Sequence, residues 1–265
     1  MSELIISLNK IAIEVSKYIN EIKDEKDLSK IIGIHSGDTT RLIDKRSEEY
    51  IFELLRNTGL KIRFVSEESG VINKENYDYT AVIDPLDGST NFLLDVPWYS
   101  VSVALYDKNA NGILDSVAGF VVHVPYNKVY SYDEKYAYIN GEIFRAYDNS
   151  TLPKVILTYF DDRGLDKALK ILDSVKGYKI RSLGSASLDM ILVCTGKAYM
   201  FFDIRGKLRN VDVSASSNFC KHLNLIPTTL AGSKINSGID DIYKIDEIIL
   251  SHDQDLMKRI FSFFS

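Results

Sequence analysis

The stretch Ile83-Asp84-Pro85-Leu86-Asp87-Gly88-Ser89-Thr90-Asn91 follows an apolar run, residues 80–83, that is typical of a buried strand. Pro85 fixes its own φ and Gly88 tolerates a positive φ, so we expect a sharp turn after the strand. Such a turn can direct Asp84, Asp87 and the Leu86 carbonyl at one point, and hard oxygen ligands suit Mg²⁺ or Mn²⁺ better than zinc. The backbone N–H groups of Gly88, Ser89 and Thr90 come next and can bind an anion. A surface turn without a metal explains the same residues equally well when they are taken alone.

The bulk composition is that of an ordinary globular protein. The 265 residues are 45% hydrophobic and 26% charged, and a net charge of −5 argues against general nucleic-acid binding. The first residues open an amphipathic helix and no apolar run is long enough to span a membrane, so we expect a cytoplasmic protein without a membrane partner. The two cysteines, Cys194 and Cys220, lie in apolar helical patterns and are expected to be buried, reduced thiols.

Hydrophobic periodicity divides the chain into two lobes. Helices are expected at residues 3–22 and 41–57, and antiparallel strands between residues 99 and 139. Asn140-Gly141 is a strong hairpin signal because a type I′ turn needs a positive φ twice. After Pro153 strands and helices alternate, which predicts an α+β lobe over residues 1–150 and an α/β lobe over residues 151–265. The remaining strands are expected at residues 61–66, 80–84, 154–160, 178–182, 198–204 and 247–251, and the remaining helices at residues 165–175, 185–194, 212–223 and 254–263.

Further acidic residues stand where strands end or helices begin. Glu67 and Glu68 close an apolar strand, Asp38 precedes a helix, and Asp212 lies at an expected helix start. Each has a structural explanation of its own, because Asp38 and Asp212 suit N-caps and the glutamate pair suits a solvated turn. Only their joint occurrence with Asp84 and Asp87 indicates a site.

Four blocks in this order resemble the motif set of the inositol monophosphatase family. They are Gly37-Asp38-Thr39-Thr40-Arg41-Leu42-Ile43-Asp44, Ser66-Glu67-Glu68-Ser69, Asp84-Pro85-Leu86-Asp87-Gly88-Ser89-Thr90-Asn91-Phe92 and Val211-Asp212-Val213-Ser214-Ala215. Residues 181–187 and 196–199 resemble the family too, and residues 203–209 are most similar to its archaeal branch. That branch includes enzymes that hydrolyse both inositol monophosphate and fructose 1,6-bisphosphate. The resemblance implies a layered α-β-α-β-α sandwich of the sugar phosphatase type.

The resemblance also implies roles for these residues. Glu67, Asp84 and the Leu86 carbonyl would hold one Mg²⁺, and Asp84, Asp87 and Asp212 a second, with a third ion held by Glu67 through water. Two cations make chemical sense because a phosphomonoester dianion repels an incoming hydroxide. The catalytic group would be Asp38, Ser89 and Glu68, with Ser89 and Asp38 orienting a metal-activated water and deprotonating it. Gly88, Ser89 and Thr90 would bind the phosphate, and the loop that carries Asp38 is expected to be mobile.

The expected substrate wall consists of Asp87, Arg181, Gly184, Ser185, Ala186, Asp203, Arg205 and Lys207. The basic run from Arg205 to Arg209 is either a solvated loop or a site for a second phosphate, which an arginine fork suits. These features favour a phosphomonoesterase for inositol 1-phosphate, fructose 1,6-bisphosphate or both.

Two alternatives stay open from the sequence. One is a nucleotide phosphatase for 3′-phosphoadenosine phosphate or NADP, and the other is a non-catalytic module that binds a phosphate ligand or a protein. The resemblance further implies lithium sensitivity and a homodimer. Five tyrosines are expected to form either the dimer interface or one face of a half-buried sheet: Tyr126, Tyr130, Tyr132, Tyr136 and Tyr138.

Overall fold

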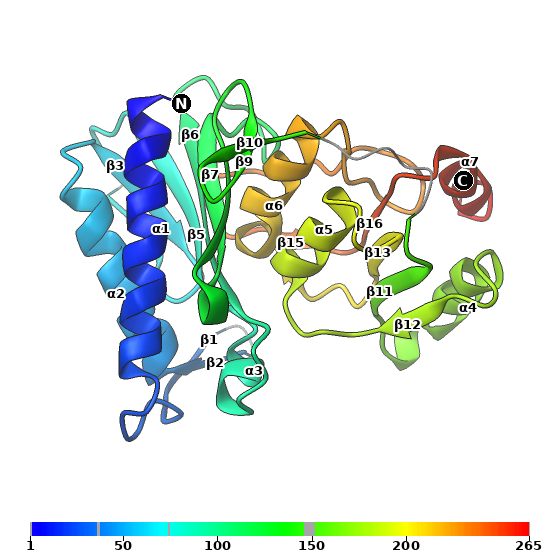
Figure 1. Ribbon diagram of the computed structural model, residues 1–265, viewed down its shortest axis with the longest axis horizontal. Helices are drawn as coiled ribbons and strands as arrows, with labels where there is room; N and C mark the ends of the chain where they lie inside the picture. Colours follow the sequence, from blue (N-terminus) through cyan, green and yellow to red (C-terminus); the bar gives the residue numbers. More distant parts are fainter. Residues whose placement is uncertain (1, 36–37, 74, 146–151, 265) are drawn as a thin grey trace.

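The computed structural model describes residues 2–35, 38–73, 75–145 and 152–264, and for residues 34, 35 and 38 the backbone alone. Its helices and two main sheets form five layers, helix–sheet–helix–sheet–helix (Figure 1). The predicted α-β-α-β-α sandwich is therefore confirmed. The helices are α1 (Glu3–Ile22), α2 (Leu42–Arg56), α3 (Ser89–Leu93), α4 (Leu165–Asp173), α5 (Ala186–Cys194), α6 (Asn210–His222) and α7 (Gln254–Phe261).

The larger sheet has eight strands, and helices cover both of its faces. In spatial order the strands are β10 (Glu142–Phe144), β9 (Ala137–Ile139), β8 (Lys128–Tyr132), β7 (Ala118–His123), β6 (Ser100–Asp107), β5 (Tyr79–Asp87), β3 (Ile62–Ser66) and β4 (Gly70–Ile72). All neighbours are antiparallel except β3 and β5. Along β6, Val103 and Leu105 pack toward α1 and α2, whereas Ala104 and Tyr106 pack toward α5 and α6. Because both faces are buried, the strand is apolar at nearly every position.

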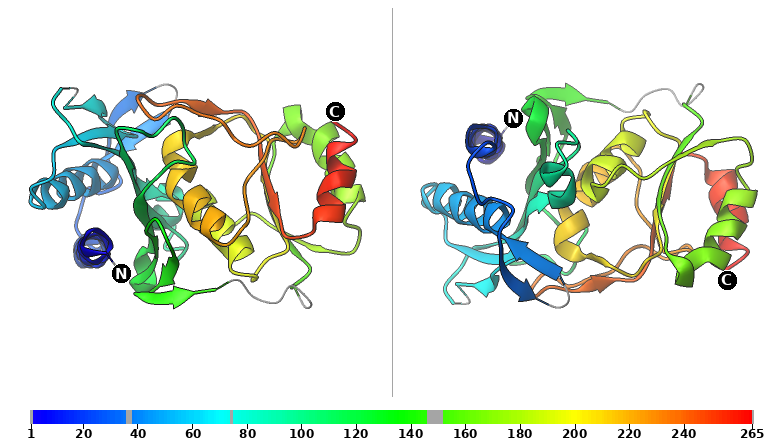
Figure 2. Two further views of the ribbon diagram at one scale, coloured as in Figure 1. Left: turned by 90° about the horizontal axis from the view of Figure 1, so that it is seen from above. Right: turned by 90° about the horizontal axis from the view of Figure 1, so that it is seen from below.

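The smaller sheet has four strands, with α4 and α7 on its outer face (Figure 2). Its order is β12 (Lys179–Arg181), β11 (Val155–Tyr159), β13 (Met200–Asp203) and β16 (Ile248–Ser251). Helix α6 lies between the two sheets, so apolar side chains surround it on every side: Val211, Val213 and Phe219 are all fully buried. Helix α6 packs against β5 and β6, so residues of this middle layer lie beside residues of the larger sheet.

Two local predictions have different outcomes. Asn140 and Gly141 have φ values of +50° and +82° and join β9 to β10, which confirms the predicted hairpin. The sharp turn expected after Asp84 is wrong, because β5 continues to Asp87. Against β6, the three steps from Asp84 to Asp87 face the two steps from Ser102 to Ser100, which is a bulge. Pro85 lies inside that bulge, where a residue without an N–H group is tolerated.

The segment before α2 forms a hairpin that the sequence analysis missed. Strands β1 (Ile31–His35) and β2 (Asp38–Arg41) pair there, so Asp38 lies in a strand and is not the N-cap of α2. A second missed pair, β14 (Leu208–Arg209) with β15 (Lys244–Ile245), leads into α6. These strands are only two to five residues long, which is too short for a clear hydrophobic period, so the pattern did not predict them.

The prediction of two reduced thiols is wrong. Cys194 ends α5 and Cys220 lies in α6, and the two form a disulfide with their Cα atoms 5.3 Å apart. Each helix pattern predicts a buried cysteine, but only the packing of α5 against α6 brings the two together.

Three of the five tyrosines named in the sequence analysis belong to the core of the chain itself. Tyr130, Tyr132 and Tyr138 are buried within the described structure, whereas Tyr126 and Tyr136 are 65% and 47% exposed. The three buried rings therefore cannot supply an interface between chains. None of the described helices is long and apolar enough to cross a membrane.

Candidate metal and phosphate site

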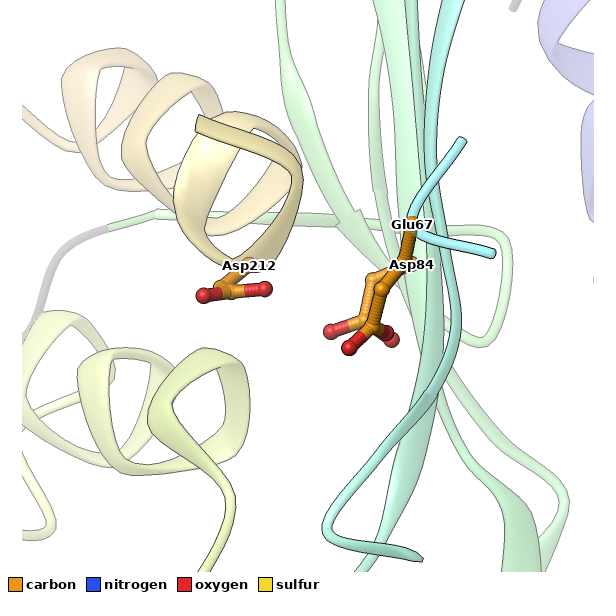
Figure 3. A group of neighbouring side chains, drawn as sticks. All are labelled: Glu67, Asp84 and Asp212. Atoms are coloured by element: carbon orange, nitrogen blue, oxygen red, sulfur yellow. The ribbon is translucent and has the colours of Figure 1, made fainter. Parts of the chain in front are cut away.

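Three carboxylates from separate elements meet at the seam between the larger sheet and the middle helices. Glu67 follows β3, Asp84 lies in β5, and Asp212 lies in the first turn of α6. One oxygen from each lies within 4.8 Å of the others, and the three side chains point toward one another (Figure 3). Since β3 and β5 are parallel neighbours, Glu67 and Asp84 emerge at the same end of the sheet. Three of the predicted metal ligands are thus brought together.

The backbone around each aspartate fixes its direction. Asp84 is 2% exposed, and its Oδ1 accepts a hydrogen bond of 3.0 Å from the Leu86 N–H within the bulge. Asp212 Oδ2 accepts one of 2.7 Å from the Arg209 N–H at the start of the helix. Helix α2 begins in the same way, because the Arg41 N–H donates to Asp44 Oδ2 at 2.9 Å. Both helix starts therefore hold an aspartate in a fixed orientation.

The pKa values of these carboxyls reveal an unbalanced charge. Burial raises the pKa of Asp84 well above its usual range, and the neighbouring Glu67, Asp87 and Asp212 raise it further. Burial likewise raises the pKa of Asp212 to about 7, against the lowering effect of Arg209. Such carboxyls ionise readily only if more positive charge arrives than one arginine supplies.

The donor set fits a hard divalent cation. Carboxylate oxygens converge here, the Leu86 carbonyl belongs to the same bulge, and the group contains no cysteine or histidine. All-oxygen donors of this kind are those that Mg²⁺ and Mn²⁺ prefer, whereas zinc favours nitrogen and sulfur.

Asp87 does not belong to the three-carboxylate group but is hydrogen-bonded to the start of α5. Its Oδ2 accepts hydrogen bonds from the Ser185 hydroxyl at 2.6 Å and the Ser187 N–H at 2.8 Å, and its Oδ1 accepts from the Ala186 N–H at 3.3 Å. Two of these donors, Ser185 and Ala186, are residues of the predicted substrate wall. Asp87 still lies close enough to this group that it helps to raise the pKa of Asp84, and Asp212 helps to raise the pKa of Asp87.

A polar cleft opens beside the carboxylates. Asp44 enters it from α2, and burial raises the pKa of Asp44 to about 8. Its Oδ1 is buried and has no hydrogen-bond partner among the described residues. The residues that line the cleft are Thr39, Thr40, Arg41, Asp44, Glu67, Glu68, Leu86, Ser89, Thr90 and Arg209.

Two of the three predicted catalytic residues, Ser89 and Glu68, line this cleft. Glu68 accepts a hydrogen bond from the Thr40 hydroxyl. The side chain of Asp38 lies outside the described part of the structure. Asp44 and Arg209 were not among the predicted site residues, although the spacing Arg41-x-x-Asp44 and Arg209-x-x-Asp212 recurs in the sequence and could have indicated both.

The predicted phosphate-binding residues lie at the start of α3. Gly88 has a φ of +92°, and a Cβ there would lie 3.0 Å from the carbonyl oxygens of Gly184 and Trp98. Only glycine fits this close approach. Ser89 and Thr90 follow in the first turn of α3 and face the cleft.

The predicted substrate wall is only partly assembled. Gly184 packs against Asn91, whereas Arg181 and Lys207 are exposed. The guanidinium of Arg205 donates hydrogen bonds to both oxygens of the buried Asp203, and its Cζ lies 4.6 Å from the centroid of the Tyr159 ring. Arg205 is thus neither a freely solvated side chain nor an open phosphate fork in this structure.

Comparisons with known proteins agree with the fold. The model of the inositol monophosphatase family matches residues 2–260. An inositol-1-monophosphatase of Aeropyrum pernix is 31% identical, over 94% of this chain and 92% of that protein. A fructose-1,6-bisphosphatase/inositol-1-monophosphatase of Methanocaldococcus jannaschii is 30% identical, over 94% and 95%. The crystal structure of an inositol monophosphatase–fructose 1,6-bisphosphatase superimposes with a TM-score of 0.80, at 28% identity and 99% coverage of both chains.

Proposed function

Because the chain belongs to the inositol monophosphatase family, we propose that it is a Mg²⁺-dependent phosphomonoesterase for inositol 1-phosphate, fructose 1,6-bisphosphate or both. The observation that carries the proposal is the group of Glu67, Asp84 and Asp212 beside a polar cleft. Relatives named for each of the two activities, at about 30% identity, support both substrates.

The metal site in this proposal uses the carboxylates of the seam. Glu67, Asp84, Asp212 and the Leu86 carbonyl would hold the cations together with Asp87, whose contacts to α5 fix its direction. The bound cations supply positive charge that offsets the charge of the phosphate ester and makes water a better nucleophile. Without the cations, the same carboxylates repel one another and the phosphate.

The chain's own residues bind the phosphate and move the proton. The N–H groups of Gly88, Ser89 and Thr90 bind the phosphate oxygens at the start of α3. The Ser89 hydroxyl orients the attacking water, and a carboxylate in the cleft accepts its proton. Asp38 is the base expected from the sequence, and Asp44 is a second candidate because it lines the same cleft as Ser89 and its Oδ1 has no hydrogen-bond partner among the described residues. Glu68 contributes negative charge on the same side of the cleft.

The sugar or inositol hydroxyls would lie along Asp87, Gly184, Ser185 and Ala186. A second phosphate would need a free basic side chain, for which Arg181 and Lys207 are exposed and Arg205 would have to leave Asp203. The homodimer and the lithium sensitivity implied by the family remain predictions, as do the two-lobe division near residue 150 and the mobile loop.

The test is phosphate release from the purified protein with Mg²⁺ or with excess chelator. Equal concentrations of inositol 1-phosphate, fructose 1,6-bisphosphate, NADP and 3′-phosphoadenosine phosphate are compared. We expect Mg²⁺-dependent release from one or both of the first two substrates. Preference for a nucleotide would replace the proposed substrates, and full activity in chelator would overturn the mechanism.

A further inference from the structure

We propose that Arg209 is a built-in counter-ion of the metal site, which the entering cation displaces. The proposal rests on the function proposed above, because it assumes that the carboxylate group binds a divalent cation. In the ion-free protein the guanidinium would keep the carboxylates together. On binding, the cation would take over that task.

Arg209 reaches two of the three carboxylates at once. Its Nη2 donates a hydrogen bond to Glu67 Oε1 and lies 3.5 Å from Asp212 Oδ1. Glu67 and Arg209 are 142 positions apart in the sequence, so this ion pair ties α6 to the end of β3. The side chains of Arg209 and Glu67 are each 20% exposed, so solvent screens the pair only in part.

The same carboxylates cannot serve both cations well. Glu67 and Asp212, which Arg209 contacts, both belong to the group that would bind the metal. A guanidinium left on these carboxylates would stand beside a divalent ion of like sign, and the two would repel each other. Binding of the ion therefore favours departure of the guanidinium.

The local structure allows the guanidinium to move while Asp212 stays in place. The Arg209 backbone N–H holds Asp212 Oδ2 at 2.7 Å, and this bond does not depend on where the side chain points. The side chain also lines the cleft that contains Ser89 and Thr90, so it can leave Glu67 without crossing the core. Arg209 thus combines a fixed backbone contact with a replaceable side-chain contact.

An alternative role makes the opposite prediction. If Arg209 served to orient Glu67 for the metal, its removal would weaken metal binding. If it serves as a counter-ion that the metal must displace, its removal strengthens metal binding and weakens the ion-free protein.

The experiment measures Mg²⁺ binding to chelator-stripped protein by calorimetry, together with melting temperatures in chelator and in saturating Mg²⁺. For Arg209→Gln we expect about tenfold tighter binding, since the metal no longer competes with a charge-assisted hydrogen bond. Its melting temperature should fall below that of the wild type in chelator, and the difference should shrink in saturating Mg²⁺. Arg209→Lys keeps the charge but loses the planar fork, so it should lie between the two.

Arg163→Gln is the matched control. Arg163 also forms an ion pair with an aspartate, Asp161, but its side chain is 71% exposed and lies outside the cleft. The control should match the wild type in both measurements. Unchanged or weaker Mg²⁺ binding by Arg209→Gln, or an equal loss of melting temperature with and without Mg²⁺, would overturn the counter-ion role.

The outcomes separate this inference from the proposed function. If the wild type itself fails to bind Mg²⁺, the proposed function falls. If the wild type binds Mg²⁺ and the Arg209 variants bind it no more tightly, only the counter-ion role falls. Should Arg209→Gln be too unstable to strip, Arg209→Lys decides the question by the direction of its change in affinity.

Discussion

Two carboxylate sites in this protein have opposite kinds of neighbour. Asp189 in α5 is completely buried, yet each of its oxygens has a neutral donor: the Trp98 Nε1–H at 2.9 Å and the Tyr159 hydroxyl at 2.7 Å. Glu67, Asp84 and Asp212 face one another instead, and Arg209 contacts two of them, Glu67 and Asp212.

The difference separates a structural carboxylate from a functional one. A buried carboxylate whose oxygens accept neutral hydrogen bonds is satisfied by the fold itself. Carboxylates that converge on one point raise each other's pKa values and need a cation from outside. Burial alone therefore does not identify a metal ligand, but the identity of the neighbours does. Four predictions test this contrast.

The largest effect is expected for Asp84→Asn. The amide keeps the shape of the side chain but removes a charge from the centre of the group, so kcat/KM should fall by more than about a hundredfold. Phosphate release with Mg²⁺ measures the change, and calorimetry should show loss of Mg²⁺ binding. The control is Asp189→Asn, which removes a buried charge at the other site and should leave Mg²⁺ binding intact. Activity of Asp84→Asn near the wild-type value would remove Asp84 from the metal site.

The second effect is the dependence of stability on pH and Mg²⁺. The pKa of Asp84 is raised well above its usual range and that of Asp212 to about 7, so both carboxyls bind protons more tightly in the folded protein than in the unfolded chain. Their contribution to stability is fully present below about pH 4, the usual pKa of an aspartate, and is lost as the pH rises to 7 and beyond.

Denaturant unfolding in chelator should therefore show stability falling over this range. Mg²⁺ at about a hundred times its Kd should restore about 2.7 kcal/mol at pH 8. The pKa of Asp189 is also raised, to about 7, so its contribution to stability is likewise lost as the pH rises. Mg²⁺ should not restore that contribution. A decline with pH that Mg²⁺ leaves unchanged in the wild type would contradict the distinction between the two sites.

A smaller effect is expected for the stability of Asp189→Asn. The amide nitrogen cannot accept, so either the Trp98 N–H or the Tyr159 hydroxyl loses its partner, at a cost of about 1–3 kcal/mol in unfolding free energy. Chemical denaturation in saturating Mg²⁺ measures it. Trp98→Phe removes one donor at the same site and should cost a similar amount. No loss in either variant would show that these hydrogen bonds do not stabilise the fold.

The smallest effect is expected for Ser185→Ala. Ser185 caps α5 through the Leu188 N–H and donates to Asp87, so its loss should cost about 1 kcal/mol of stability. Because the N–H groups of Ala186 and Ser187 still hold Asp87, the activity should fall only a few-fold. Steady-state kinetics with inositol 1-phosphate or fructose 1,6-bisphosphate measures this. A loss as large as that of Asp84→Asn would place Ser185 among the essential residues.

Much of the secondary structure followed from local pattern. The helix expected at residues 3–22 is α1, and the strand expected at residues 61–66 corresponds to β3, because both have a clear hydrophobic period. The β1–β2 hairpin and the bulge in β5 lacked such a signal. The path of β5 through Asp87 depends on its pairing with β6, and the Ser47 hydroxyl in α2 donates to the Pro85 carbonyl at 2.6 Å within the bulge. Neither partner can be inferred from residues 84–87 themselves.

For the site, the sequence by itself determined the kinds of ligand and their order along the chain. Asp84, Glu67 and Asp212 could be proposed because carboxylates beside strand and helix ends, in family-like blocks, indicate a hard metal site. The tertiary structure decided which of them converge, that Asp87 turns toward α5, that Arg209 lies on Glu67, and that Cys194 meets Cys220. The reason is physical: local pattern follows from interactions between near neighbours in the chain. These contacts arise only when α5 and α6 pack between the two sheets.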